Sequence, residues 1–151
     1  MRLSLWFGAV QAAGREDGMA LETTAMQLVA EAEKEIRTLS VDEARELLGR
    51  EDVQFVDIRD IRELQREGRI PGAYHAARGM LEFWVDPESP YHKELFAEPK
   101  TFVLYCQSGW RSALATQTLQ RMGLDGVCHV GGGFSDWKEA GAPTEPLPAR
   151  K

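Results

Sequence analysis

Cys106 and Arg111 stand in the segment CQSGWRS, in an arrangement suited to nucleophilic sulfur chemistry. The apolar run TFVLY ends at the cysteine, and a polar loop then leads into the amphipathic segment 111–123. Because the first backbone N–H groups of a helix have no partner within it, we expect them to face the sulfur. Such N–H groups and a nearby cation lower the pKa of a thiol and hold an anion or a sulfur-bound negative charge. The alternative is a buried cysteine that only ends a strand before a polar turn.

The elements that must position this loop alternate between apolar strands and amphipathic helices. Strand patterns cover residues 53–58, a short stretch within 70–76, 101–106 and 126–130. Helix patterns cover residues 22–38, 39–50, 60–69, 81–84, 111–123 and 134–141. This alternation indicates an α/β fold with a mainly parallel sheet. In such sheets ligands bind beyond the carboxyl ends of the strands, which is where Cys106 stands.

Two of these helices carry signals for their start and their buried side. Ser40 is a good N-cap residue, and Glu43 three positions later completes a capping box. In the segment 111–123, the spacing of Leu114 and Met122 predicts that both lie on the buried side.

Length, charge and cysteine content limit the classes of protein. A chain of 151 residues is typical of one domain, with room for an extension, and it can bury a hydrophobic core without disulfides or a structural metal. The net charge of −6 argues against a general nucleic-acid binder, and no apolar run approaches the roughly 20 residues that span a bilayer. Two cysteines are too few for a disulfide framework and show no zinc spacing. A single Cys106–Cys128 bridge is the alternative to a small buried thiol at Cys128.

The first residues, MRLSLWFGAVQAAGRED, are open to several interpretations. One arginine, a short apolar stretch and AVQAA partly resemble a secretory signal. The alternatives are a disordered leader, a segment that packs Leu5, Trp6 and Phe7 on the domain, and a natural start at Met19. We expect a cytoplasmic protein, or a periplasmic one if residues 1–18 act as a signal.

Three motifs, in order, resemble the rhodanese-like sulfurtransferases. CQSGWRS looks like the active-site loop of that family, and FVDIRDIRELQREGRIPGAYHA is similar to its early segment. HVGGGFSDWKEAGAP resembles its closing motif. The resemblance covers residues 39–146, which leaves 1–38 as an N-terminal extension with a helix and 147–151 as a tail. It implies a three-layer α/β fold, with a central, mainly parallel sheet flanked by helices.

The resemblance also implies a reaction. A sulfane sulfur would pass from thiosulfate or a similar small anionic donor to Cys106, and from the resulting persulfide to a thiophilic acceptor. The acceptor would be cyanide, a thiol or a sulfur-carrier protein, and neither a metal nor an organic cofactor is needed. Arg111 would bind the donor, while the remaining loop residues would shape the substrate pocket: Gln107, Ser108, Gly109, Trp110 and Ser112. Trp110 has an alternative role as an exposed docking residue for a protein partner.

Other polar residues are expected to be structural. Asp57, Arg59 and Glu63 match the early motif of the family, where they look like a buried polar cluster that ties strand ends beneath the active loop. The three histidines are scattered, and no spacing marks them as a base or a metal ligand, so structural or solvent-facing positions are expected: His75, His92 and His129.

Two other classes of function compete with the enzyme. A dual-specificity phosphatase or arsenate reductase resembles C-x5-R, whereas four residues separate Cys106 from Arg111 here and leave less room for a tetrahedral phosphate. A protein-binding module or a sulfur carrier with low thiosulfate activity is the non-enzyme alternative. The intact Cys106 and Arg111 argue against a purely binding role.

Overall fold

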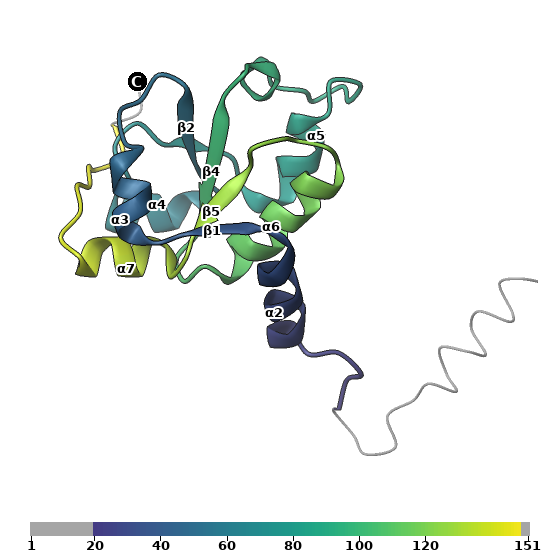
Figure 1. Cartoon of the computed structure of the whole chain (residues 1–151). Coiled ribbons are helices and arrows are strands. Elements are labelled where there is room, and N and C mark those ends of the chain that lie inside the picture. The colour runs from purple at the N-terminus through teal and green to yellow at the C-terminus, as the bar shows by residue number, and fades with distance from the viewer. Residues whose placement is uncertain (1–19, 149–151) are drawn as a thin grey trace, which may run out of the picture.

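A five-stranded parallel sheet forms the centre of the computed structural model, which describes residues 20–148 (Figure 1). The strands lie in the order β1-β5-β4-β2-β3, and each neighbouring pair is parallel. Their bounds are β1 Arg37–Leu39, β2 Val53–Asp57, β3 Tyr74–His75, β4 Thr101–Tyr105 and β5 Cys128–Val130. This sheet confirms the predicted α/β fold, and it places Cys106 directly after the central strand β4.

Helices cover both faces of the sheet (Figure 1). Their bounds are α2 Ala25–Glu35, α3 Val41–Glu46, α4 Ile61–Glu67, α5 Leu81–Val85, α6 Trp110–Arg121 and α7 Gly133–Glu139, with 3-10 turns η1 Arg78–Met80 and η2 Glu94–Ala97. Residues of α3 and α7 share one hydrophobic core, and residues of α5 and α6 share the other. None of the helices within residues 20–148 is long and apolar enough to cross a membrane.

Strand β4 supplies side chains to the two cores in turn. Val103 and Tyr105 lie in the core with α3 and α7, whereas Phe102, Leu104 and Cys106 lie in the core with α5 and α6. This follows from the two-residue period of a strand, which turns successive side chains to opposite faces. The Cys106 side chain therefore points toward the α6 side of the sheet.

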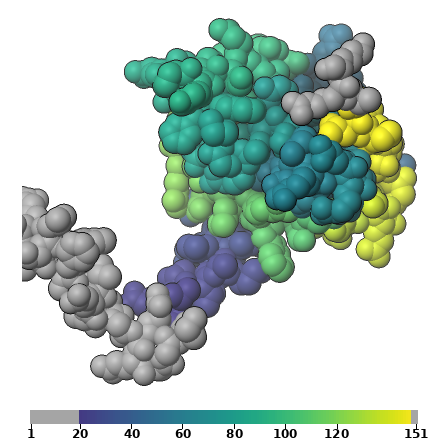
Figure 2. All heavy atoms as spheres, turned by 180° about the vertical axis from the view of Figure 1, so that it is seen from behind, coloured from purple at the N-terminus to yellow at the C-terminus, as the bar shows by residue number. Residues whose placement is uncertain are grey.

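The N-terminal helix is shorter than its prediction at both ends. The predicted helix 22–38 spans only Ala25–Glu35, and the next residues form β1 at the edge of the sheet. Three residues are too few for alternation to be read from sequence, and β1 exists because it pairs with β5. Helix α2 packs on α6 and projects from the body of the molecule (Figure 2). The interpretations of residues 1–19, including a signal at 1–18 and a start at Met19, lie outside the described residues.

Helix caps were predicted better than helix faces. The Ser40–Glu43 capping box is present at the start of α3, as predicted. The predicted buried side of α6 is wrong at Met122, which is 44% exposed. Helix α6 lies between the sheet and α2 and buries mainly small residues on both sides, namely Ser112, Ala113, Ala115, Thr116 and Leu119. Small side chains allow this close approach, and a search for large apolar residues overlooks them.

Candidate active site

The Cys106 sulfur lies at the start of α6 and accepts two backbone hydrogen bonds. The N–H of Gly109 donates to Sγ over 3.2 Å, and the N–H of Ser112 donates over 3.4 Å. The Cys106 thiol lies 3.6 Å from the hydroxyl oxygen of Ser112. The residue is only 1% exposed, so the loop encloses the sulfur almost completely. These contacts direct two N–H donors at Sγ, an arrangement suited to a sulfur-bound negative charge.

The loop is held in this shape by the N-terminus of α7. The N–H of Phe134 donates to the carbonyl of Cys106 over 2.8 Å, and the N–H of Ser135 donates to the carbonyl of Gln107 over 3.0 Å. Because the C=O and N–H of a trans peptide point in opposite directions, the two following amides are turned away from α7. Within residues 20–148 four loop amides have no protein acceptor: Gln107, Ser108, Trp110 and Arg111. Such a run of free N–H groups is suited to binding an anion.

Glycine is required where the loop and the α7 turn touch. Gly109 has φ +92°, and a Cβ there would lie 2.9 Å from the backbone nitrogen of Gly132. Gly133 has φ +60°, and a Cβ there would lie 2.5 Å from the carbonyl oxygen of Cys106. The two motifs CQSGWRS and HVGGG, distant in sequence, therefore form one backbone-to-backbone contact.

Arg111 and Glu63 form an ion pair beside the loop. Two guanidinium nitrogens of Arg111 donate to the two carboxylate oxygens of Glu63 over 2.9 and 3.0 Å. These bonds lower the pKa of Glu63 and raise that of Arg111, and the charge of Cys106 adds to the rise at Arg111. The Arg111 side chain is 42% exposed, so it can meet a small anion from solvent.

A second ion pair, between Asp57 and Arg59, is completely buried beneath the loop. The guanidinium donates to both Asp57 oxygens, at 2.6 Å for the closest pair of atoms, and to the carbonyl of Gly68 over 2.8 Å. It also donates to the side-chain oxygen of Gln107 over 3.0 Å and lies 4.4 Å from the centre of the Phe134 ring. Asp57 and Arg59 thus connect the end of β2 to the Cys106 loop.

Two residues differ from the roles that sequence predicted. Glu63 does not join the buried cluster with Asp57 and Arg59, because its carboxylate is bound by Arg111. The Gln107 side chain does not line the sulfur, because it bonds to Arg59 and to the hydroxyl of Ser135, the latter over 2.9 Å. In both cases a partner far away in the chain determines the direction of the side chain.

The remaining loop residues divide between the sulfur and the surface. Gly109 and Ser112 are buried and contact Sγ, whereas Ser108 is exposed. Trp110 is 56% exposed, which suits the docking alternative better than a pocket wall. The structure therefore places two of the six predicted binding residues, Gly109 and Ser112, against the sulfur, and Arg111 beside the loop in its ion pair with Glu63.

His129 has a position that sequence reasoning missed. It is fully buried in β5, where its Nδ1 lies 2.9 Å from the hydroxyl of Ser112 and its Nε2 lies 2.9 Å from the hydroxyl of Thr38. Burial lowers its pKa to about 4, so the ring is neutral. The available signal was a lone polar residue between the apolar Cys128 and Val130 of a predicted strand.

The two cysteines are free thiols and belong to different cores. Cys128 is on the α3 and α7 side of the sheet, opposite Cys106, so the alternative of a bridge is excluded by the strand geometry. Cys128 is fully buried, as predicted for a small buried thiol, and burial raises its pKa to about 11.

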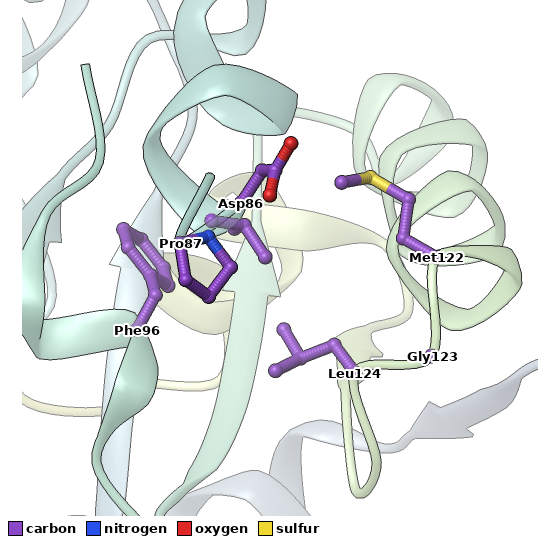
Figure 3. Close-up of a pocket in the computed structure, with 7 residues that line it drawn as sticks. Asp86, Pro87, Phe96, Met122, Gly123 and Leu124 are labelled. Carbon is purple, nitrogen blue, oxygen red and sulfur yellow. The ribbon is translucent and has the colours of Figure 1, made fainter. Parts of the chain in front are cut away.

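A pocket of about 380 Å³ lies beside the turn that follows α6 (Figure 3). It is lined by the end of α5, η2 and the turn after α6, with Phe96, Met122 and Leu124 around it. Cys106 is at the opposite end of α6, a helix of 12 residues. At 1.5 Å per residue this separates the two by about 18 Å, so the pocket is not part of the cysteine site.

Comparison with known proteins identifies the family. Residues 40–140 match the family model described as the rhodanese-like domain, and the chain therefore belongs to this family. The human thiosulfate:glutathione sulfurtransferase is 31% identical over 68% of this chain and 93% of its own length. The thiosulfate sulfurtransferase GlpE of Shewanella oneidensis is 33% identical over 69% of this chain and 94% of its own length. An uncharacterized protein from Synechocystis is 36% identical, and this chain covers only 55% of it.

Solved structures show the same fold. A protein of unknown function from Rhodopseudomonas palustris, described as a possible tyrosine phosphatase, is 49% identical with a TM-score of 0.81, over 84% of this chain and 98% of that chain. The human single-domain sulfurtransferase is 31% identical with a TM-score of 0.56, over 68% of this chain and 95% of that chain. The boundary predicted between an extension and the domain, at residue 38, stays a prediction.

Proposed function

We propose that the protein is a sulfurtransferase in which Cys106 carries a sulfane sulfur as a persulfide. The observation that supports this most directly is the pair of N–H groups, from Gly109 and Ser112, that donate to Sγ. The free amides of the same loop offer further donors to a negative charge one atom beyond Sγ. The sulfurtransferases among the relatives agree with this chemistry.

The first half of the reaction suits a small anion such as thiosulfate. Arg111 attracts the donor, and the Cys106 thiolate attacks its outer sulfur. A new S–S bond forms to Sγ, the old S–S bond breaks, and sulfite leaves with the electron pair. The product is a persulfide anion on Cys106, which the loop amides stabilise. Because Cys106 is only 1% exposed, we expect only a small reacting group to reach the sulfur.

The second half transfers that sulfur to an acceptor. A thiolate or cyanide attacks the outer sulfur, the S–S bond to Cys106 breaks, and the thiolate returns. A sulfur-carrier protein would bring its own thiol, and Trp110, exposed beside the loop, offers such a partner an aromatic contact. The acceptor class is thus a thiol or cyanide, in solution or on a protein.

The test is a mass measurement on the protein after incubation with thiosulfate. We expect one added sulfur, which cyanide removes and which Cys106→Ala never gains, while Cys128→Ala gains it as the wild type does. Arg111→Ala should raise the KM for thiosulfate more than Cys128→Ala does. A wild-type protein that takes up no sulfur from thiosulfate, a polysulfide or a persulfide donor would contradict the proposal.

Phosphoester hydrolysis is the second candidate, favoured by the description of the Rhodopseudomonas neighbour. The loop argues against it, because four residues rather than five separate Cys106 from Arg111. Hydrolysis also requires a general acid for the leaving group, and the nearby carboxylates of Asp57 and Glu63 are held in ion pairs. Release of phosphate from a phenyl phosphate ester that depends on Cys106, without sulfur uptake, would reverse the order of the two candidates.

A further inference from the structure

A chain of hydrogen bonds leads from Cys106 through the protein to the outer edge of the sheet. The Cys106 thiol lies 3.6 Å from the Ser112 hydroxyl, which lies 2.9 Å from Nδ1 of His129. Nε2 of the same ring lies 2.9 Å from the hydroxyl of Thr38. Ser112 and His129 are fully buried, whereas Thr38 is exposed on the edge strand β1. The chain thus connects a nearly sealed sulfur to a residue that contacts solvent.

The fold holds each link in place. Thr38 is directly opposite His129 in the β1–β5 ladder, and β5 pairs in turn with β4, which ends one residue before Cys106. The methyl group of Thr38 is packed against Gly131, where a Cβ would come within 2.9 Å of it. Ser112 is in the first turn of α6, so its hydroxyl reaches both the sulfur and the ring. Strand pairing and helix position together fix the geometry of the chain.

The neutral ring of His129 allows the chain to run in either of two directions. A neutral imidazole donates from one nitrogen and accepts at the other. In one direction the Cys106 thiol donates to Ser112, Ser112 donates to Nδ1 of His129, and Nε2–H donates to Thr38. In the other direction every bond is reversed, so that Ser112 donates to a Cys106 thiolate. Among residues 20–148 no charged side chain hydrogen bonds to the ring, so no ion pair selects one direction.

We propose that Ser112, His129 and Thr38 form a hydrogen-bond relay that reverses its direction when the Cys106 proton leaves to solvent at β1, and that the reversed chain, with Thr38 donating to His129 and Ser112 donating to Sγ, stabilises the thiolate. The S–H proton moves to Ser112, the hydroxyl proton of Ser112 moves to Nδ1, and the Nε2 proton moves to Thr38. Thr38 releases its own proton to water or to a buffer base. His129 is neutral before and after, and every bond of the chain has reversed.

The relay rests on the proposed role of Cys106 as the nucleophile, but it adds residues that do not touch the substrate. The other groups of the loop beside Cys106 are the amides of Gly109 and Ser112, which donate to Sγ, and the guanidinium of Arg111, which is bound to Glu63. They stabilise the thiolate and offer no route for its proton, because an amide or a guanidinium does not give up its own proton near neutral pH. Ser112, His129 and Thr38 are therefore positioning and proton-transfer residues.

The test measures the alkylation rate of Cys106 by iodoacetamide against pH, quantified on the peptide that contains this residue. Alkylation requires the thiolate but no sulfur donor, so it is independent of sulfur transfer. Thr38 provides a matched pair: Thr38→Val keeps the methyl group and removes the hydroxyl, whereas Thr38→Ser keeps the hydroxyl and removes the methyl group. Ser112→Ala removes the middle link, and the double variant tests whether the two residues act through one path.

We expect Ser112→Ala to move the pH midpoint of alkylation up by about one unit, a tenfold loss of thiolate below the midpoint. Thr38→Val should move it up by about half a unit, and Thr38→Ser should leave it unchanged. In the double variant the shift should equal that of Ser112→Ala alone. A wild-type midpoint in Thr38→Val, or shifts of the two residues that add, would overturn the relay. Sulfur uptake that fails while this coupling persists would count against the proposed function only.

Discussion

Removal of the buried Arg59 charge is the sharpest test of how the protein supports its loop. The Arg59 side chain has no exposure, donates to both oxygens of Asp57, and also bonds to Gly68 and Gln107. Arg59→Met would leave the Asp57 carboxylate buried without its partner. Loss of one member of a buried pair costs about 3–5 kcal/mol, a large share of the roughly 5–15 kcal/mol that stabilises a domain.

The chain contains a matched control for this substitution. Asp60 and Arg62 have the same spacing and the same bidentate contact as Asp57 and Arg59, but they are exposed to solvent. Water screens that pair, so Arg62→Met should cost far less. Urea unfolding, followed by the fluorescence of the buried Trp137, measures both losses.

Two further variants show which property of Arg59 matters. Arg59→Lys keeps the charge but loses the forked geometry, so its loss should be intermediate. Combining Arg59→Met with Asp57→Leu removes both charges and should restore part of the stability. A loss for Arg59→Met no larger than that for Arg62→Met would refute the reasoning, since burial would then make no difference.

Two other predictions concern the loop and the buried histidine. Gly109→Ala should abolish sulfur uptake and lower the free energy of unfolding by more than about 1 kcal/mol, because its Cβ would meet the nitrogen of Gly132 at 2.9 Å. Gly49→Ala is the control, because Gly49 has φ +86° but open space around it, so this variant has only the conformational strain. Equal losses of stability in urea for the two variants would show that the close approach is unimportant. The pKa of His129 is lowered to about 4, so below about pH 6.5 the unfolded chain binds a proton that the native ring does not. Stability should therefore fall as pH falls from about 6.5 to about 4, by about 3 kcal/mol more in the wild type than in His129→Gln; parallel pH curves for the two proteins would disprove this.

Local signals in the sequence predicted most of the scaffold correctly. The capping box at Ser40, the apolar runs that form β2 and β4, and the strand–loop–helix order around Cys106 all depend on residues a few positions apart. Propensities and caps operate at that range, so a single sequence contains them. The motif order also predicted the rhodanese-like domain, which the family comparison shows.

The predicted side-chain contacts were wrong or missing where the partner lies far away in the sequence. Glu63 was placed with Asp57 and Arg59, its neighbours in sequence, but it bonds to Arg111, 48 residues away. His129 was expected at a structural or solvent-facing position, but its contact with Thr38 was not predicted, because 91 residues separate them and the β1–β5 ladder brings them together. Side-chain direction depends on packing between elements, which spacing along the chain does not reveal.

The sequence by itself determined that a thiol and an arginine stand between a buried strand and a helix, because strand, glycine loop and helix are each specified by adjacent residues. It also predicted that backbone N–H groups face the sulfur, and the tertiary structure identifies the donors as Gly109 and Ser112, in a loop whose carbonyls the α7 turn holds. Only the tertiary structure decided that the sulfur is enclosed and connected to Thr38. Contacts across the sheet and between helices join residues that are far apart in the sequence, so neighbouring residues do not specify them and they form only when the chain folds.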